Sequence, residues 1–142
     1  MRFNSSRFGE IEVDNEKIIN FPRGLAGFEG LQRYCLLFTD RPVKCLQSID
    51  DPNVAFMLVD PFVIYKDYTF TAVDEVEEFL QCNKIENMVV LVTATINEKD
   101  MSVNLRAPIV INTSNMRAAQ LMILDERVPA KVVVPIVERS GA

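Results

Sequence analysis

Residues 51–62 have the sequence DPNVAFMLVDPF, an apolar run with an Asp-Pro step at each end. Proline fixes its own φ angle, has no N–H to donate, and disfavours the helical region for the residue before it. Each aspartate is therefore expected at a strand boundary, with its carboxylate free to cap the N–H groups of the turn or to bind a partner. The pattern predicts a strand over residues 54–59 with a rigid turn on either side.

Strand patterns dominate the sequence on both sides of this run. The predicted strands cover residues 34–38, 43–49, 88–95, 102–104, 108–111 and 131–137, and residues 116–124 favour a strand over a helix. Residues 11–13 and 17–21 are expected to pair as an early hairpin, residues 88–95 to be buried on both faces, and residues 131–137 to form a terminal edge strand. Short turns between neighbours favour antiparallel pairing. The expected fold is mainly β, a small antiparallel β-barrel in which residues 1–142 form a single domain.

One segment has the periodicity of a helix. Residues 73–80 place apolar side chains on one side at helical spacing and glutamates on the other. Asp74 falls in the first turn, where a carboxylate interacts favourably with the helix dipole. The barrel is therefore expected to carry one or two short helices.

The composition excludes several classes of protein. The chain has 142 residues, is 49% hydrophobic and contains no histidine. The lack of histidine removes Ser-His and Cys-His nucleophiles and the commonest metal ligand. Cys35, Cys45 and Cys82 form no C-x-x-C pair and are expected to be buried thiols in a reducing compartment. No apolar run reaches the roughly 18 residues of a membrane helix, and the first residues have no signal core, so a cytoplasmic protein is expected.

The negative charge is concentrated in one segment. Residues 67–86 contain six acidic residues and one basic residue, a net charge of −5 that equals the formal charge of the whole chain. Direct nucleic-acid binding is disfavoured because phosphate contacts require clustered Lys and Arg, and the sequence has no such cluster. A basic protein partner is the electrostatic complement of this segment, and a solvated helix surface is the simpler explanation.

Carboxylates gather around the bracketed strand. Asp50, Asp51, Asp60 and Asp67, with Gln47, are candidates for a Mg²⁺ site or a carboxylate dyad. Aspartates that cap their own turns are the simpler explanation of both Asp-Pro steps. No other residue supplies a nucleophile, oxyanion donors or a phosphate clamp, so neither a cofactor nor a metal is expected.

Residues 21–29, FPRGLAGFE, form a distinctive loop. Gly24 and Gly27 permit positive φ angles, so the loop can turn tightly and present Phe28 and Glu29. No Gly-Lys-Ser follows, which excludes a phosphate loop. Phe21 and Phe28 either pin the loop to the barrel or act as exposed aromatic anchors for a partner.

Two asparagines bracket another apolar strand. Asn104 precedes it, Pro108 leads it, and Asn112 ends it. Side-chain amides suit the task of holding neighbouring turns. Structural use is therefore expected, with a recognition edge as the alternative.

Together, these motifs resemble the bacterial flagellar assembly factor FliW family. The motifs are FPRGL (21–25), GFE (27–29), LQS (46–48), DDP (50–52), DPF (60–62), DY (67–68), NL (104–105) and APIVIN (107–112). Their order and spacing across most of the chain make the set specific. Ala26 departs from the pattern, because the family loop often has proline there, and the stretch around Val128 lacks an aromatic expected before the final strand.

The resemblance implies a non-catalytic β-barrel protein that binds flagellin and also CsrA, an RNA-binding translational repressor of flagellin synthesis. Flagellin and the repressor then divide a limited pool of this protein, so export of flagellin releases it to capture the repressor. The family is understood to act on the repressor away from its RNA surface, which requires coupling between two sites. The free protein is expected to be a monomer.

Three sets of residues follow as expectations. The candidate contacts for the repressor are the acidic residues Asp50, Asp51, Asp67, Asp74, Glu75, Glu77 and Glu78. The candidate contacts for flagellin are Phe21, Phe28 and Glu29. The residues expected to shape the surface are Gly24, Gly27, Gln47, Pro52, Asp60, Pro61, Asn104, Pro108 and Asn112. The alternatives are a metal-assisted hydrolase that uses Asp50, Asp51 and Asp60, and a structural protein that interacts only with itself.

Overall fold

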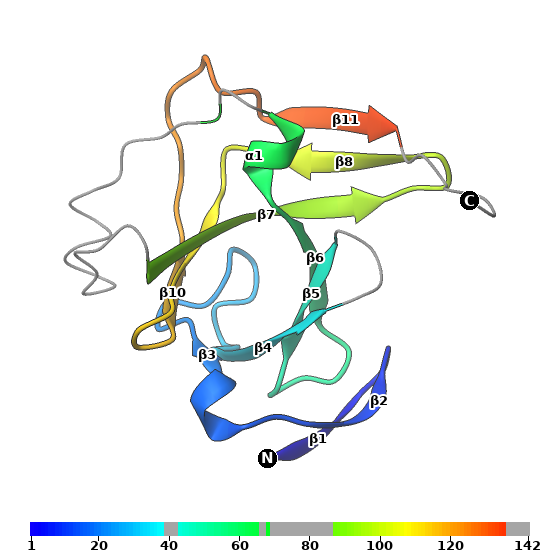
Figure 1. Ribbon diagram of the computed structural model, residues 1–142, viewed down its shortest axis with the longest axis vertical. Helices are drawn as coiled ribbons and strands as arrows, with labels where there is room; N and C mark the ends of the chain where they lie inside the picture. Colours follow the sequence, from blue (N-terminus) through cyan, green and yellow to red (C-terminus); the bar gives the residue numbers. More distant parts are fainter. Residues whose placement is uncertain (39–42, 66–67, 69–86, 136–142) are drawn as a thin grey trace.

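The computed structural model describes residues 1–38, 43–65, 68 and 87–135 (Figure 1). The helix predicted over residues 73–80 lies outside these ranges. Within them, seven strands form a closed ring. They are β3 (Ile19–Asn20), β4 (Arg33–Phe38), β5 (Lys44–Ser48), β6 (Ala55–Val59), β7 (Met88–Ile96), β9 (Ile109–Asn112) and β10 (Arg117–Gln120).

Pairing between β7 and β9 closes the ring, in a register that runs from Met88 opposite Asn112 to Leu91 opposite Ile109. The described barrel pairings are antiparallel except for that of β3 with β10, which is parallel. The prediction of a mainly β barrel is therefore confirmed, with one parallel contact where only antiparallel pairs were expected. The predicted strand over residues 54–59 is β6, which begins one residue later.

Two strands extend the sheet beyond the barrel. These are β8 (Asp100–Asn104), which pairs with β7, and β11 (Lys131–Pro135), which pairs with β8 at the edge of the sheet. The edge position predicted for the last strand is confirmed. Because β7 belongs to both parts, Val89 packs against the barrel interior while Val92 is buried in a second cluster outside it. Burial on both faces is confirmed for the middle of this strand.

The amino-terminal hairpin differs from the prediction. Strand β1 (Arg2–Ser5) pairs with β2 (Gly9–Glu12), and a 3-10 helix, η1 (Asn15–Lys17), follows. The expected pairing of residues 11–13 with 17–21 is wrong. The turn forms earlier because Gly9 has a φ of 74° and the Ser5 hydroxyl accepts hydrogen bonds from the N–H groups of Arg7 and Phe8.

The strand predicted over residues 116–124 is confirmed in its first half. Beyond β10, the N–H groups of Leu121 and Ile123 donate to the carbonyls of Pro108 and Arg106, at 2.8 and 2.7 Å. Leu121 and Ile123 are buried, and the side chains between and after them are exposed. The chain thus continues alongside residues 106–108 after the strand itself has ended.

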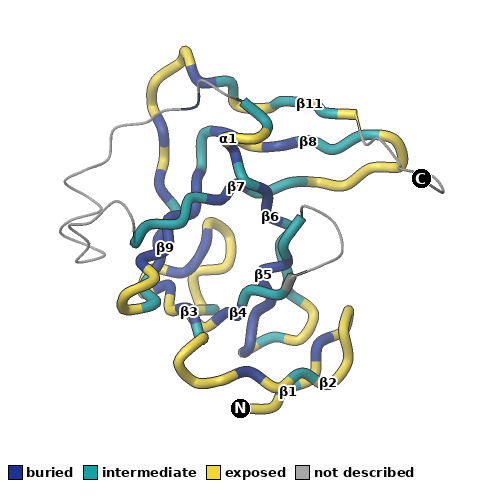
Figure 2. The backbone as a smooth tube through the Cα atoms, viewed as in Figure 1, coloured by how far each residue is buried: buried dark blue, intermediate teal, exposed yellow. Residues whose placement is uncertain are grey.

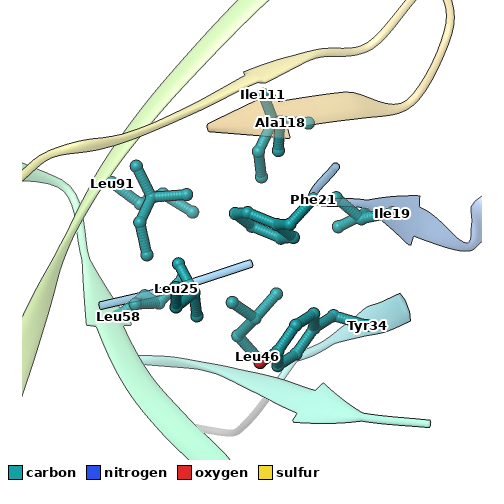
Figure 3. Close-up of a cluster of buried hydrophobic side chains, with 10 residues drawn as sticks. Ile19, Phe21, Leu25, Tyr34, Leu46, Leu58, Leu91, Ile111 and Ala118 are labelled. Carbon is teal, nitrogen blue, oxygen red and sulfur yellow. The ribbon is translucent and has the colours of Figure 1, made fainter. Parts of the chain in front are cut away.

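The buried hydrophobic residues of the described ranges form three core clusters. The first fills the barrel, and Figure 3 shows Phe21 at its centre, although Phe21 and Leu25 come from a loop and not from a strand. The second lies outside β7 and includes Val92, and the third packs the β1–β2 hairpin against the outer face of the barrel around Cys35. Figure 2 shows the buried residues following the barrel strands. The loop over residues 21–32 therefore plugs the barrel with its own side chains.

Candidate functional site

The loop that plugs the barrel has a fixed backbone. Gly24 and Gly27 have φ angles of 66° and 85°, and a Cβ atom on Gly24 would lie 2.6 Å from the Cα of Glu29. The Oε1 of Glu29 accepts a hydrogen bond from the N–H of Gly27, at 3.2 Å. The N–H of Ala26 donates to the Oε1 of Gln120 on β10, at 3.0 Å. Proline has no N–H, so alanine at this position permits a bond that a proline here would not form.

The two candidate aromatic anchors differ in exposure. Phe21 is 0% exposed and packs edge-on against Tyr34, with 5.2 Å between ring centroids. Of the two interpretations of Phe21, the structure supports the one in which it pins the loop to the barrel, because its ring fills the interior. Phe28 is 39% exposed and packs edge-on against Phe56, also at 5.2 Å. Phe28 thus holds the loop and still presents part of its ring to solvent.

The turn between β5 and β6 is held by its own side chains. The Ser48 hydroxyl accepts hydrogen bonds from the N–H groups of Asp50 and Asp51, at 3.2 and 3.0 Å. The Oδ1 of Asp51 accepts from the N–H of Asn53, at 3.0 Å. At the other Asp-Pro step, Asp60 accepts from the N–H of Phe62 at 2.8 Å and caps α1 (Pro61–Ile64). The prediction that both aspartates cap their own turns is confirmed.

Arg33 connects this turn to the end of the plugging loop. Its Nη2 and Nε atoms donate to the Oδ1 of Asp50, at 2.6 and 3.0 Å. This hydrogen bond, and then the negative charge of Asp50, raise the pKa of the Arg33 guanidinium. Because the carboxylate of Asp50 is already paired, Asp51 is the aspartate of this turn whose charge has no ion-pair partner among the described residues.

The side chain of Gln47 is 0% exposed and holds the turn between β5 and β6 by hydrogen bonds from the interior. Its Oε1 accepts a hydrogen bond from the Ser5 hydroxyl at 2.8 Å, which ties the β1–β2 hairpin to the barrel. Its Nε2 donates to the carbonyls of Ser48 at 3.0 Å, Val54 at 3.2 Å and Pro52 at 3.4 Å. The buried amide of Gln47 therefore connects the end of β5, the turn before β6 and the β1–β2 hairpin.

Changing Gln47 to methionine keeps the size of the side chain and removes all of these bonds. We expect a loss of about 2–3 kcal/mol in the free energy of unfolding, because buried carbonyls and the Ser5 hydroxyl lose a partner. Urea denaturation followed by circular dichroism measures this loss. The matched control is Gln32→Met, since Gln32 is exposed and its side chain donates, among the described residues, one bond, to the Pro22 carbonyl at 3.2 Å. Equal losses in the two variants would contradict the role given to Gln47.

The asparagines around β9 hold turns, as predicted. The Oδ1 of Asn104 accepts a hydrogen bond from the N–H of Arg106, at 3.0 Å. Asn112 is buried, and its Oδ1 accepts from the N–H and the hydroxyl of Ser114, at 3.0 and 2.7 Å. Their amide groups shape the backbone at each end of this strand.

The buried titratable groups are held in their neutral forms. Burial raises the pKa of the Tyr34 phenol, and the negative charge of Asp50 raises it further. Burial also raises the pKa of the Cys35 thiol to about 11, with a smaller contribution from Cys45. The expectation of buried thiols is confirmed at both positions, while Cys82 lies outside the described residues. A thiol with this pKa is a poor nucleophile at neutral pH.

The candidate carboxylates do not converge on one site. Asp51 and Asp60 lie at opposite ends of β6, and Asp50 is paired with Arg33. Among the described residues, no group of three or more His, Cys, Asp or Glu side chains could hold a metal ion. Asp67 and the acidic residues of the predicted helix lie outside the described ranges; the latter are Asp74, Glu75, Glu77 and Glu78.

The structure holds four of the candidate residues at one end of the barrel, three of them exposed and one, Asp51, half-buried. We call this set the rim and define it as Phe28, Glu29, Asp50 and Asp51. Phe28 is held at this end of the barrel because its ring packs against Phe56 of β6. Asp50 is held at the same end by its hydrogen bond from Arg33. The sequence did not point to Arg33. The inward position of Phe56 could be predicted, because Phe56 and Leu58 alternate on the inward side of β6.

The fold and the rim define a class of protein, a small β-barrel that presents aromatic and acidic side chains and, in the described ranges, assembles no catalytic group. Comparison with known sequences gives the family. The sequence model of the FliW protein matches residues 2–134. The chain therefore belongs to the FliW family of flagellar assembly factors, as the sequence motifs predicted.

Individual relatives agree with this assignment. The chain is 37% identical to a flagellar assembly factor FliW of Caldanaerobacter subterraneus subsp. tengcongensis, over 89% of this chain and 88% of the relative. It is 39% identical to that of Oceanobacillus iheyensis, over 89% of both chains. A crystal structure of a flagellar assembly factor FliW matches with a TM-score of 0.86 at 28% identity, covering 93% of this chain and 95% of that one.

Membership of this family makes the chain a non-catalytic assembly factor. The hydrolase alternative is therefore wrong, in agreement with the length of β6 that separates Asp60 from Asp50 and Asp51. In the part of the chain that the structure describes, no helix has the length and apolar character needed to cross a bilayer.

Proposed function

We propose that this chain is a partner switch that binds flagellin and a CsrA-type translational repressor in the cytoplasm. Each partner competes for a limited pool of the protein, so the amount of free flagellin sets how much repressor is captured. The function needs recognition surfaces and no chemistry, which agrees with a non-catalytic family. The single observation that carries the proposal is the rim, where a half-exposed aromatic ring and an unpaired carboxylate are held on rigid turns.

The acidic part of the proposal concerns the repressor. The contacts proposed for it are Asp50 and Asp51 on the rim, together with Asp67, Asp74, Glu75, Glu77 and Glu78 of the acidic segment. A protein that binds RNA needs basic side chains, and acidic residues complement them. Asp50 is neutralised in part by Arg33, so Asp51 is the aspartate of the rim with more charge to offer.

The Asp51→Asn variant tests the charge without disturbing the turn. Asparagine keeps an Oδ1 atom that can accept the Asn53 N–H, so the cap is retained while the charge is lost. We expect a threefold to fivefold weaker affinity for the repressor, about 0.6–1 kcal/mol, with a smaller dependence on salt. Calorimetry at two salt concentrations measures both. The matched control is Asp60→Asn, which removes the same charge from the other Asp-Pro cap at the far end of β6. Unchanged affinity and salt dependence in Asp51→Asn would contradict a contact at Asp51.

The aromatic part of the proposal concerns flagellin. Phe28, with Glu29 beside it, is the anchor that the rim presents, and a ring held in place loses little entropy on binding. We expect Phe28→Ala to weaken flagellin binding by about 2 kcal/mol, roughly thirtyfold. The matched control is Phe62→Ala at the other end of the barrel, where an exposed ring packs edge-on against Tyr68 at 5.7 Å. Normal capture of flagellin by a folded Phe28→Ala protein would show that Phe28 only pins the loop.

A further inference from the structure

The barrel wall has an opening beside β4. Strand β3 has two residues, and these cover only the start of β4, with Ile19 opposite Tyr34 and Asn20 opposite Arg33. The chain before Ile19 turns away into η1, because the N–H of Lys17 donates to the Asp14 carbonyl at 2.9 Å. Among the strands that the structure describes, the remainder of β4 therefore has a neighbour on one side only, β5.

The hydrogen-bond alternation identifies which backbone groups face the opening. In an antiparallel pair, successive residues direct their N–H and C=O groups to alternate sides. The N–H of Ile49 donates to the carbonyl of Arg33 at 3.0 Å, so Arg33, Cys35 and Leu37 point toward β5. The N–H and C=O of Leu36 point the other way, into the opening. Neither has a hydrogen-bond partner among the described residues.

An open cavity of about 190 Å³ lies at this edge. It is lined by Glu12, Val13, Asp14 and Lys17 on one side and by residues 35–37 of β4 on the other. Val13 and Cys35 are buried, so the floor of the cavity is apolar, while Glu12 and Asp14 bring charge to its margin. The opening thus offers the free backbone groups and the apolar floor that an added strand requires.

The segment that borders the cavity has a net negative charge. The β1–β2 hairpin and η1, with the residues between them, carry four acidic and three basic residues; they are Glu10, Glu12, Asp14 and Glu16, with Arg2, Arg7 and Lys17. Arg2 lies 3.7 Å from both Glu10 and Glu12, and these side chains are 66–70% exposed, so the pairs contribute little. Asp14 and Glu16 form no ion pair within the described ranges. A basic ligand complements this edge.

We propose that the open edge of β4 docks an extended, basic segment of a protein partner, which adds a short strand beside Leu36. The backbone of the segment pairs with the N–H and C=O of Leu36, an apolar side chain faces the cavity floor, and flanking Lys or Arg side chains approach Glu12 and Asp14. The site does not depend on the rim. The rim lies where β4 begins, and the open edge lies further along the same strand.

Nuclear magnetic resonance with the ¹⁵N-labelled full chain tests the proposal. The probe is the blocked peptide Lys-Val-Lys-Val-Lys, and the control peptide is Glu-Val-Glu-Val-Glu. We expect the basic peptide to shift the Leu36 amide resonance and to slow its hydrogen exchange at least fivefold. The Leu37 amide, already directed toward β5, serves as the internal reference. The acidic peptide should leave both unchanged.

A charge reversal distinguishes docking at the open edge from general electrostatic attraction of a basic peptide to the chain. Asp14 caps η1 without a side-chain hydrogen bond, so Asp14→Lys leaves the local backbone contacts intact. We expect this variant to bind the basic peptide at least fivefold more weakly, and the control Glu98→Lys, on the turn before β8, to bind it normally. The proposal is overturned if both peptides bind alike or if the basic peptide shifts amide resonances elsewhere and not that of Leu36. It is also overturned if rising protein concentration alone slows hydrogen exchange at Leu36, which would assign the edge to a second copy of this chain.

Discussion

The Phe21→Ala variant should lose about 3–5 kcal/mol in its free energy of unfolding, the range typical of a buried phenylalanine cut to alanine. Phe21 is 0% exposed and lies at the centre of the cluster that fills the barrel (Figure 3). Native domains are stable by only about 5–15 kcal/mol, and the loss is therefore a large fraction of the total.

Urea denaturation of Phe21→Ala and Phe28→Ala under the same conditions compares their losses in the free energy of unfolding. Both rings sit on the same loop and each packs edge-on against another aromatic ring at 5.2 Å. Phe28 is 39% exposed, so its removal should cost about 1–2 kcal/mol, well below the cost of removing Phe21. Similar losses in the two variants, or a greater loss in Phe28→Ala, would contradict the assignment of Phe21 to the core and Phe28 to the rim.

The Gly24→Ala variant is the second change with a large expected effect. Gly24 has a φ of 66°, and a Cβ atom there would lie 2.6, 2.8 and 2.9 Å from the Cα, O and C atoms of Glu29. The neighbour is backbone and cannot rotate away as a side chain can. We expect a loss of about 3 kcal/mol in the free energy of unfolding, from the left-handed conformation and the displaced loop together.

Gly27→Ala is the matched control, because it has a φ of 85° but no atom within 4 Å of the added Cβ. It should lose only the cost of the left-handed conformation, about 1–2 kcal/mol. The difference between the two melting curves then measures the close approach of residues 24 and 29. If Gly24→Ala is no less stable than Gly27→Ala, the tight packing of this loop is refuted.

The sequence predicted those parts of the fold that depend on local chemistry. The Asp-Pro steps gave the limits of β6 to within a residue, because proline and a capping aspartate act on their own turn. The same locality explains the asparagines around β9. The amino-terminal hairpin could not be placed, because the alternation of residues 11–13 and 17–21 does not specify a partner. The pairing was decided by Gly9 and by the hydroxyl of Ser5, which shape a turn before that stretch.

The candidate site was predictable only in part, for a related reason. Residue type indicated that Phe28 and Asp51 occupy shaped turns, and the structure places them at one end of the barrel. Contacts between distant parts of the chain had no local signal, and the bond from Arg33 to Asp50 is one of these. The glycines at positions 24 and 27 showed that the loop turns tightly, but not that Phe21 turns inward. Whether Phe21 is buried depends on the space that the barrel strands leave between them, and no single segment of the sequence reveals that space.

One measurement tests the partner switch most directly. The purified chain is mixed with flagellin, with the CsrA-type repressor and with both, and each mixture is sized by chromatography with light scattering. The account predicts a complex with each partner alone, and a mixture in which added flagellin displaces the repressor from the chain. Failure to form either complex, or repressor that stays fully bound at saturating flagellin, would contradict it.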